Sequence, residues 1–302
     1  MSPINFKPTA LAPLFTEFTG FHYMRSGSYK SVYQVTGKNT QVDEVLKVIV
    51  LPEKGKSEED DALHEQELGR VQRETSILEK CGSPYVVKLG SVKPRETLIE
   101  GRACFAYTEE LLPGVPLSDK IDLNKKSNLQ PSEFEVKSLL FCLVSAVQNL
   151  WEQQRVVHRD IKPGNIFATG ISSRPYVLFD LGIAYDVTVP GLTLHKNENP
   201  HTPLYVAPEI LDVNFRETIS YRSDLYSSAL SAYEFAAGIH PLKPDINSVA
   251  RTHTFALQKE PTPLEILRPN FTAETCWLIN QLLKKRPPLR PANMALILKH
   301  LQ

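Results

Sequence analysis

A short polar segment of this 302-residue chain, Val157–Ile166 (Val-His-Arg-Asp-Ile-Lys-Pro-Gly-Asn-Ile), gathers side chains that could carry out chemistry together. Lys162 follows Asp160 by two positions and Asn165 follows it by five, within a turn that the proline and the glycine favour. A carboxylate can accept the proton of a hydroxyl group, an ammonium group can neutralise charge on a phosphoryl group, and an amide oxygen can hold a magnesium ion. The set therefore predicts phosphoryl transfer; a solvated polar loop is the alternative.

This segment resembles the catalytic loop of the protein kinases, which carries His-Arg-Asp and an asparagine five positions beyond the aspartate. Two further runs resemble kinase motifs: Asp-Leu-Gly at 180–182, where the family has Asp-Phe-Gly, and Ala-Pro-Glu at 207–209. The resemblance covers about residues 15–302. It implies a eukaryotic-type serine/threonine protein kinase with an α+β fold in two lobes. One lobe would be a small antiparallel β-sheet with one main helix, and the other would be larger and mostly helical.

The resemblance also implies a role for each residue. Asp160 would orient the acceptor hydroxyl and take its proton, and Lys162 would stabilise phosphate charge. Asn165 and Asp180 would hold magnesium ions that bridge the phosphates of ATP. The ATP contacts would be Gly27, Lys30, Val32, Val45, Lys47, Glu110, Leu111, Phe167 and Asp180.

One lysine, Lys47, lies inside an otherwise apolar, strand-like run at 44–50. A buried lysine is costly unless it is paired, and an edge lysine whose ammonium group reaches solvent is the alternative. The next segment, 56–80, has a helical period and contains Glu74. In kinases a strand lysine pairs with a glutamate of the following helix and holds the α and β phosphates. We therefore expect Lys47 and Glu74 to pair and to belong to the catalytic set.

The glycine-rich loop departs from the family pattern. Gly-x-Gly-x-x-Gly-x-Val corresponds here to residues 25–32, in which only Gly27 remains of the three glycines. A side chain in place of glycine limits how closely backbone amides approach phosphate oxygens. Lys30 stands at the third glycine position, as in the with-no-lysine kinases, where a lysine of this loop serves the phosphates. Because Lys47 is also present, we expect Lys47 to hold the phosphates and Lys30 to assist.

The segment 109–114 breaks the strand pattern with proline and glycine and resembles the kinase hinge, whose backbone binds adenine. Its register leaves Thr108 or Glu109 as the residue at the back of the nucleotide pocket. We favour Thr108, because a carboxylate that faces an apolar pocket is costly. The expected organisation is an extended arm at 1–14, a smaller lobe at 15–110 and a larger lobe at 111–302, with an activation segment at 180–209.

The resemblance also implies two contacts that position these side chains. Asp224, near the start of an apolar helix, would bond the backbone of 158–159, and Arg290 would pair with Glu209. Periodicity predicts the other elements. The expected strands and helices are a hairpin at 27–35, strands at 44–50, 85–89 and 103–107, a central helix at 131–154 and a helix from 223.

The activation segment carries hydroxyl groups that suggest regulation. Thr188 and Thr193 are candidates for phosphorylation, and Arg159 could bind such a phosphate. Thr202 matches the threonine that contacts the catalytic groups in serine/threonine kinases. Two copies of the chain could therefore associate for autophosphorylation.

Composition limits the partners. Lysine plus arginine and aspartate plus glutamate number 34 each, so no net field favours nucleic acid or an acidic membrane. The four cysteines are scattered, which favours reduced thiols and makes a zinc site improbable. We see no signal peptide and no apolar stretch near the roughly 20 residues that span a bilayer. We expect a cytoplasmic protein that acts on a protein substrate.

Two other functions fit parts of the sequence. A pseudokinase that acts as a scaffold or allosteric partner is suggested by the damaged glycine loop. A kinase-like enzyme for small molecules is the other alternative, although its relatives generally lack the Lys-Pro and Ala-Pro-Glu runs present here. An active protein kinase is favoured because all five groups that serve the phosphates and the metal remain: Lys47, Glu74, Asp160, Asn165 and Asp180.

Overall fold

The computed structural model describes residues 5–26, 30–55, 57–182, 184–187, 204–212, 218–242 and 249–302. The chain divides into two compact units, residues 1–80 with 87–112 and residues 81–86 with 113–302. The predicted α+β kinase fold is confirmed. The short segment 81–86 was expected in the smaller lobe but belongs to the larger unit. There the Leu178 amide donates to the Tyr85 carbonyl at 2.8 Å, and the Arg174 guanidinium bonds the Pro84 carbonyl.

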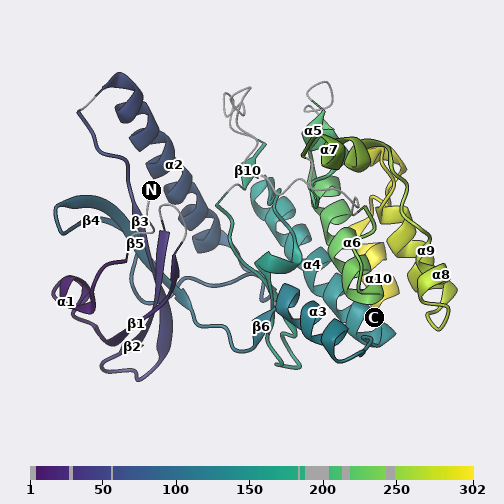
Figure 1. Ribbon diagram of the computed structural model, residues 1–302, viewed down its shortest axis with the longest axis horizontal. Helices are drawn as coiled ribbons and strands as arrows, with labels where there is room; N and C mark the ends of the chain where they lie inside the picture. Colours follow the sequence, from purple (N-terminus) through teal and green to yellow (C-terminus); the bar gives the residue numbers. More distant parts are fainter. Residues whose placement is uncertain are drawn as a thin grey trace. The chain divides into compact units, whose positions relative to one another are not determined.

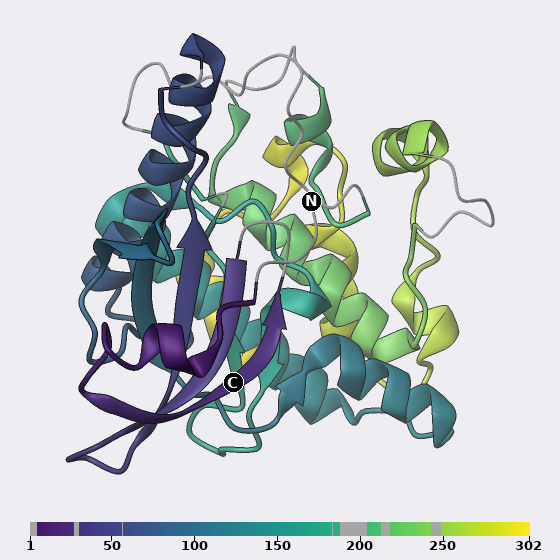
Figure 2. The ribbon, with the colours of Figure 1, turned by 60° about the vertical axis from the view of Figure 1, so that its left-hand side comes forward.

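The smaller unit is built on a five-stranded antiparallel sheet in the order β1-β2-β3-β5-β4 (Figure 1). Helix α2 packs on one face of the sheet, and the short helix α1 packs on the other (Figure 2). The elements are α1 Pro8–Leu11, β1 Phe18–Ser26, β2 Lys30–Gly37, β3 Asp43–Val50, α2 Glu58–Lys80, β4 Arg95–Ile99 and β5 Arg102–Glu110.

Strands β3 and β5 pair so that side chains alternate between the two faces of the sheet. Lys47 lies opposite Tyr107 in the ladder, so both belong to the same face. That face packs on α2, where Tyr107 lies in one core cluster with Val71. The other face buries Leu46 in a second core cluster. Because both faces of the sheet are covered by other parts of the smaller unit, the sequence of β3 is almost continuously apolar.

The expected extended arm is wrong for the part of it that the structure describes. Phe6, Leu11 and Phe15 are buried in the core cluster on the sheet face opposite α2. The Phe6 amide donates to the Tyr33 hydroxyl at 2.8 Å, and that hydroxyl donates to the Phe6 carbonyl. Three buried apolar side chains, each worth about 1.5–3 kcal/mol, account for this packing.

The strand predicted at 85–89 does not form. Its residues make isolated bridges instead, Val86 with Leu178 and Leu89 with Glu109. The first bridge lies within the larger unit and the second within the smaller one. Because the backbone bonds of this segment are divided between two units, no continuous ladder can develop.

The larger unit is mostly helical, and helices α4 and α6 lie at its centre (Figure 1). A capping box starts α4, since the Ser132 side chain accepts from the Glu135 amide while the Glu135 carboxylate accepts from the Ser132 amide. The elements are β6 Val115–Pro116, α3 Leu117–Lys126, α4 Glu133–Gln154, β7 Val156–Val157, η1 Pro163–Asn165, β8 Ile166–Ala168, β9 Tyr176–Leu178, β10 Tyr185–Asp186, α5 Pro208–Leu211, α6 Tyr221–Ala237, α7 Val249–Gln258, α8 Leu264–Leu267, α9 Ala273–Leu282, η3 Pro287–Leu289 and α10 Met294–Leu301.

The predicted pair between Arg290 and Glu209 is confirmed. The guanidinium donates two parallel bonds to the carboxylate, at 2.7 and 2.9 Å, and neither side chain is more than 1% exposed. The same guanidinium donates to backbone carbonyls of Lys284 and Arg222. The pair therefore fixes α5 to the residue that directly follows η3, and it defines local geometry more than it raises stability.

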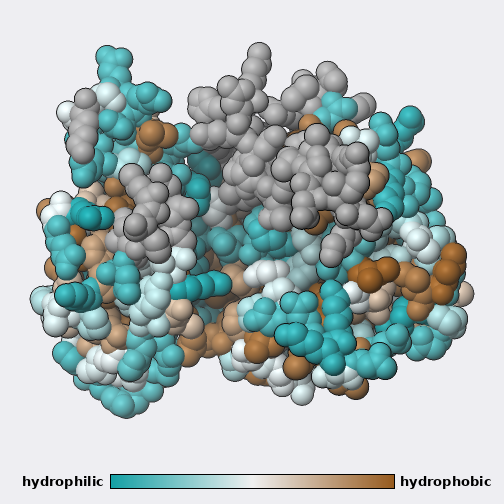
Figure 3. All heavy atoms as spheres, in the orientation of Figure 1, coloured by the Kyte–Doolittle hydropathy of each residue, from teal (hydrophilic) through white to brown (hydrophobic). Residues whose placement is uncertain are grey.

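Among the described residues, no helix is long and apolar enough to cross a bilayer. The face shown in Figure 3 is largely hydrophilic, with apolar side chains gathered at the right, over α8 and α9. Ile266 of α8 and Trp277 of α9 are exposed large hydrophobic side chains of these two helices.

Candidate active site

Two short strand ladders bring the catalytic loop and Asp180 together. Strand β7 precedes the loop and pairs with β10, while β8 follows the loop and pairs with β9. In the second ladder Ile166 lies opposite Leu178, and the Phe179 amide donates to the Asn165 carbonyl at 3.0 Å. Asp180 comes directly after this bond. The register of the ladder therefore places Asp180 beside the end of the catalytic loop.

Asp160 is held by two neighbours in the same loop. Its Oδ2 atom lies 2.8 Å from Lys162 Nζ and 2.8 Å from Asn165 Nδ2. The Asn165 amide nitrogen also donates to the Asp160 carbonyl at 2.9 Å. The side chain of Asp160 is 15% exposed and that of Lys162 is 24% exposed. A carboxylate that is oriented and still partly accessible can receive the proton of an acceptor hydroxyl.

Asp224 bonds the backbone of the catalytic loop at His158 and Arg159, as predicted. Its buried carboxylate accepts hydrogen bonds from the amides of His158 at 2.7 Å and Arg159 at 3.0 Å. Burial raises the pKa of Asp224 to about 7, whereas these two donors act to lower it. Arg159 has a φ of 66°, a left-handed conformation that is strained for a residue with a side chain. The two hydrogen bonds that Asp224 accepts hold the loop in this strained conformation.

His158 is buried within the loop and is a neutral acceptor. Its Nδ1 atom accepts from the Asp160 amide at 3.3 Å. Burial lowers the pKa of the imidazole, which outweighs the nearby carboxylates Asp160 and Asp180. The ring therefore orients the backbone at Asp160 without adding a charge beside it.

In the smaller unit, Lys47 is buried and has two carboxylate neighbours. The predicted pair with Glu74 is present, with Nζ 3.7 Å from Oε1. The nearest partner is Glu109, to which Lys47 Nζ donates a hydrogen bond. Thr108, favoured by sequence for this position, faces the other side of the sheet, where its hydroxyl accepts from the Val92 amide at 2.9 Å. That expectation is wrong because strand alternation places Glu109, and not Thr108, on the face of Lys47.

The sequence model of the protein kinase domain family matches residues 21–301. The chain belongs to this family. It is 28% identical to MAP kinase kinase PBS2 of Saccharomyces cerevisiae over 272 residues. These residues make up 89% of this chain and 37% of PBS2. Protein kinase wis1 of Schizosaccharomyces pombe is 25% identical over 286 residues, 91% of this chain and 42% of wis1. Serine/threonine-protein kinase pakG of Dictyostelium discoideum is 27% identical over 278 residues, 90% of this chain and 20% of pakG. The chain thus spans less than half the length of these relatives.

The sheet of the kinase domain brings several predicted ATP contacts to one face. Val32 lies opposite Lys47 in the β2–β3 ladder, and Lys30 and Val45 lie two positions away along their strands. All four therefore point to the same side of the sheet. Gly27, by contrast, lies outside the described residues, as do Thr188, Thr193 and Thr202.

Of the other predicted contacts, Glu110 and Leu111 belong to the smaller unit and Phe167 belongs to the larger one. Glu110, at the end of β5, accepts a bond from the Lys88 amide at 2.9 Å through Oε1, and Leu111 follows it. In the larger unit, the ring of Phe167 packs edge-on against Phe179, with centroids 5.7 Å apart. The ring of Phe167 is thereby held against Phe179, the residue that directly precedes Asp180.

The side chains of Asn165 and Asp180 fit a magnesium ion by their chemistry. Carboxylate and amide oxygens are ligands that Mg²⁺ accepts. Asn165 uses its amide nitrogen for both bonds to Asp160, and this fixes the orientation of the amide group. In the described part of the chain, no cluster of three or more histidine, cysteine, aspartate or glutamate side chains offers a competing metal site.

Sequence reasoning missed Glu109 as a partner of Lys47. The two residues are 62 positions apart and meet only through the register of β3 with β5. The alternation of side chains along the strand was the available signal, because Glu109 lies two positions beyond Tyr107 and both therefore belong to one face. Only the pairing of β3 with β5 shows that Lys47 belongs to that same face.

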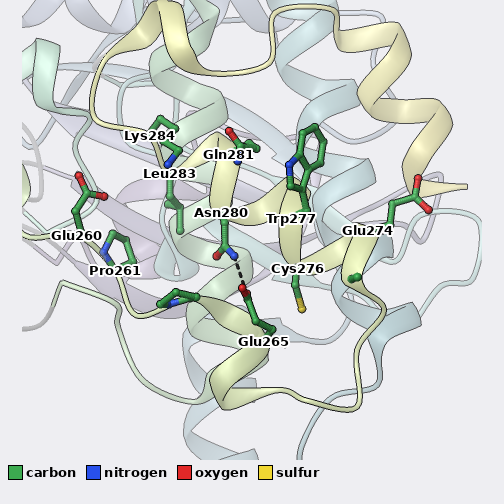
Figure 4. A pocket seen from close by; sticks show the side chains of 12 residues that line it. Glu260, Pro261, Glu265, Glu274, Cys276, Trp277, Asn280, Gln281, Leu283 and Lys284 are labelled. Carbon is green, nitrogen blue, oxygen red and sulfur yellow. Dashed lines mark hydrogen bonds between the residues drawn. The ribbon is translucent and has the colours of Figure 1, made fainter.

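A separate cavity of about 850 Å³ lies in the larger unit beside α8 and α9 (Figure 4). Trp277 and Asn280 line it from α9, and Asn280 donates to Glu265 of α8 at 2.8 Å. None of the predicted catalytic or ATP-binding residues lines this cavity.

Proposed function

We propose that this kinase domain transfers the γ-phosphoryl group of ATP to a serine or threonine hydroxyl of a protein. The observation that carries the proposal is the arrangement at Asp160, whose carboxylate lies 2.8 Å from both Lys162 Nζ and Asn165 Nδ2. An oriented base, a cation and an amide are thus combined in one partly accessible loop. Catalysis of phosphoryl transfer consists mainly of such positioning and electrostatic stabilisation.

The proposed reaction is a direct, in-line displacement without a covalent enzyme intermediate. The acceptor oxygen forms a bond to the γ-phosphorus while the bond between that phosphorus and the β–γ bridging oxygen breaks, and ADP leaves. Asp160 orients the hydroxyl and receives its proton. Lys162 and Lys47 stabilise negative charge on the phosphates. Magnesium, when held by Asn165 and Asp180, neutralises charge on the phosphates.

The proposed acceptor is a protein. The Lys-Pro run after Asp160 and the Ala-Pro-Glu run at 207–209 favour a protein over a small molecule, and Lys162 together with Thr202 favours serine or threonine over tyrosine. The names of two relatives describe MAP kinase kinases. Protein kinases are therefore the first acceptors to test. The balanced charge and scattered cysteines support a cytoplasmic location as part of this proposal.

Autophosphorylation of the activation segment is a further part of the proposal. Arg159, next to the catalytic aspartate, could bind a phosphate on Thr188 or Thr193. Mass spectrometry of active protein is expected to find phosphate within residues 183–202. An active protein that carries no phosphate there would remove this part of the proposal.

An assay with radiolabelled ATP and generic protein acceptors tests the function as a whole. Wild-type protein is expected to label the acceptor, whereas Asp160→Ala is not. A pseudokinase would label nothing above the level of Asp160→Ala. A small-molecule kinase would consume ATP with added metabolites and leave the protein acceptor unlabelled.

A further inference from the structure

Lys47 lies between two buried carboxyl groups in the smaller unit. Glu109 accepts a hydrogen bond from its ammonium group, and Glu74 Oε1 lies 3.7 Å away. The side chains of all three residues are 6% exposed or less. One ammonium group cannot fully neutralise two carboxylates in so dry a place. The two acids therefore compete for Lys47, and Glu109 has the shorter contact.

Tyr107 explains why Glu74 has the longer contact. Its hydroxyl donates to Glu74 Oε1 at 2.9 Å, and its ring lies under Lys47 Nζ at 5.4 Å from the centroid. Glu74 is thus partly satisfied by a neutral donor. Glu109 lies two positions beyond Tyr107 on the same face of β5, where its carboxylate accepts a hydrogen bond from Lys47 Nζ.

We propose that Glu109 is a positioning residue that competes with the phosphates of the nucleotide for Lys47 and must give up its bond when they bind. This inference rests on the proposed ATP-dependent function and names a residue that regulates the same site. A phosphate beside Lys47 would lie close to the Glu109 carboxylate, and like charges in a buried place repel strongly. Glu109 can relieve that repulsion by moving away or by taking up a proton.

Proton uptake follows from the groups that face Glu109 within the smaller unit. Burial raises the pKa of its carboxyl group; Lys47 and Lys30 act to lower it, and Glu74 acts to raise it. Tyr107 faces the same cluster as a neutral donor. Bound phosphates add negative charge and raise this pKa further, so nucleotide binding takes up a proton. Affinity must then fall as the pH rises through the interval between the two pKa values.

Isothermal titration calorimetry with magnesium and the non-hydrolysable analogue AMP-PNP tests the competition. Glu109→Gln keeps the shape of the side chain but removes its charge and its titration. It is expected to bind AMP-PNP roughly fivefold more tightly than wild type, because a charge-assisted bond is about twice as strong as a neutral one. Titrations in two buffers of different ionisation enthalpy are expected to show fewer protons taken up by Glu109→Gln than by wild type.

Glu74→Gln is the matched control, because it removes the same charge from the same cluster. It leaves Glu109 as the remaining charged partner of Lys47, so it is expected to bind AMP-PNP no more tightly than wild type. If both variants bind AMP-PNP equally more tightly than wild type, the gain comes only from the lower net negative charge of the cluster, and the proposal is overturned. Glu96→Gln, on the exposed strand β4, is expected to match wild type.

The outcomes also separate this inference from the proposed function. If wild type binds AMP-PNP but Glu109→Gln binds equally or less tightly with the same proton count, the competition is wrong and the function stands. If neither protein binds AMP-PNP, both fail. Thermal unfolding checks that Glu109→Gln is folded, and Glu109→Met, which is apolar and of similar length, must tighten binding as well.

Discussion

Two lysine–carboxylate pairs of this kinase domain, Lys162–Asp160 and Lys47–Glu109, differ in the sequence distance between the partners and in their exposure to water. Lys162 and Asp160 are two positions apart in one loop, and both side chains remain partly exposed. Lys47 and Glu109 are 62 positions apart on neighbouring strands, and both are buried. A local pair follows from spacing. A pair across strands depends on a register that many other residues determine.

The difference has energetic consequences. Solvent screens the exposed pair, so its contribution to stability is small, and its use is to orient a carboxylate. The buried pair loses its hydration, and removal of Lys47 leaves two carboxyl groups, Glu109 and Glu74, that the surroundings solvate poorly. The loop should therefore tolerate substitution without unfolding, whereas loss of Lys47 should destabilise the domain.

Asp160→Asn should have the largest effect and should separate function from stability. We expect phosphate incorporation to fall about a thousandfold, because the amide cannot take the hydroxyl proton. The unfolding temperature should hardly change, since the hydrogen bonds of the loop can persist. A radiolabelled ATP assay beside thermal unfolding checks both, and retention of a tenth of wild-type activity would contradict the role of Asp160 as base.

Lys47→Met should destabilise the domain by about 3–5 kcal/mol, because it leaves Glu109 and Glu74 buried without a cation. The double variant Lys47→Met/Glu109→Met removes one of these carboxyl groups and should recover a large part of the loss. Urea denaturation measures both values. If the single variant is as stable as wild type, the cluster is not the buried, desolvated site that distinguishes it from the loop.

The same lysine should matter more for activity than its neighbour in the glycine-rich loop. Lys47→Met is expected to lower the rate about a hundredfold or more, because it removes a group that stabilises phosphate charge. Lys30→Gly, which restores a family glycine, should be tolerated. Steady-state rates of purified variants decide the question, and the reverse order would make Lys30 the essential lysine.

Asp224→Ala tests whether the loop depends on support from outside its own sequence. The change leaves the buried amides of His158 and Arg159 without an acceptor, and we expect a loss of about 1–3 kcal/mol in unfolding free energy. Asp122→Ala, which removes an exposed carboxylate of α3, is the control and should have little effect. An equal loss of unfolding free energy in both variants would show that the catalytic loop does not depend on the hydrogen bonds to Asp224.

Lys162→Met should have only a small effect on stability, within about 1 kcal/mol, because the pair with Asp160 is partly exposed. Its effect should instead appear in the phosphotransfer rate. A loss of stability as large as that of Lys47→Met would remove the contrast between the two pairs.

The catalytic loop could be predicted from sequence because its geometry is local. Asp160, Lys162 and Asn165 meet within six positions, and their types alone limit the chemistry. Asp224 and Arg290 were also placed, through the family resemblance, and the structure confirms their contacts. The errors concern long-range contacts. The three prolines and the lack of periodicity in residues 1–14 predict an extended arm, and nothing in this sequence shows which surface Phe6 covers.

By itself, the sequence determined that this chain is a protein kinase domain and which loop would hold its base, since short motifs fix both the residue types and their spacing. Only the tertiary structure decided which carboxylate holds Lys47. Strand pairing and alternation choose the face of each side chain, and a shift by one residue would have placed Thr108 there instead. A contact that depends on register is set by the whole sheet, and no short segment contains that information.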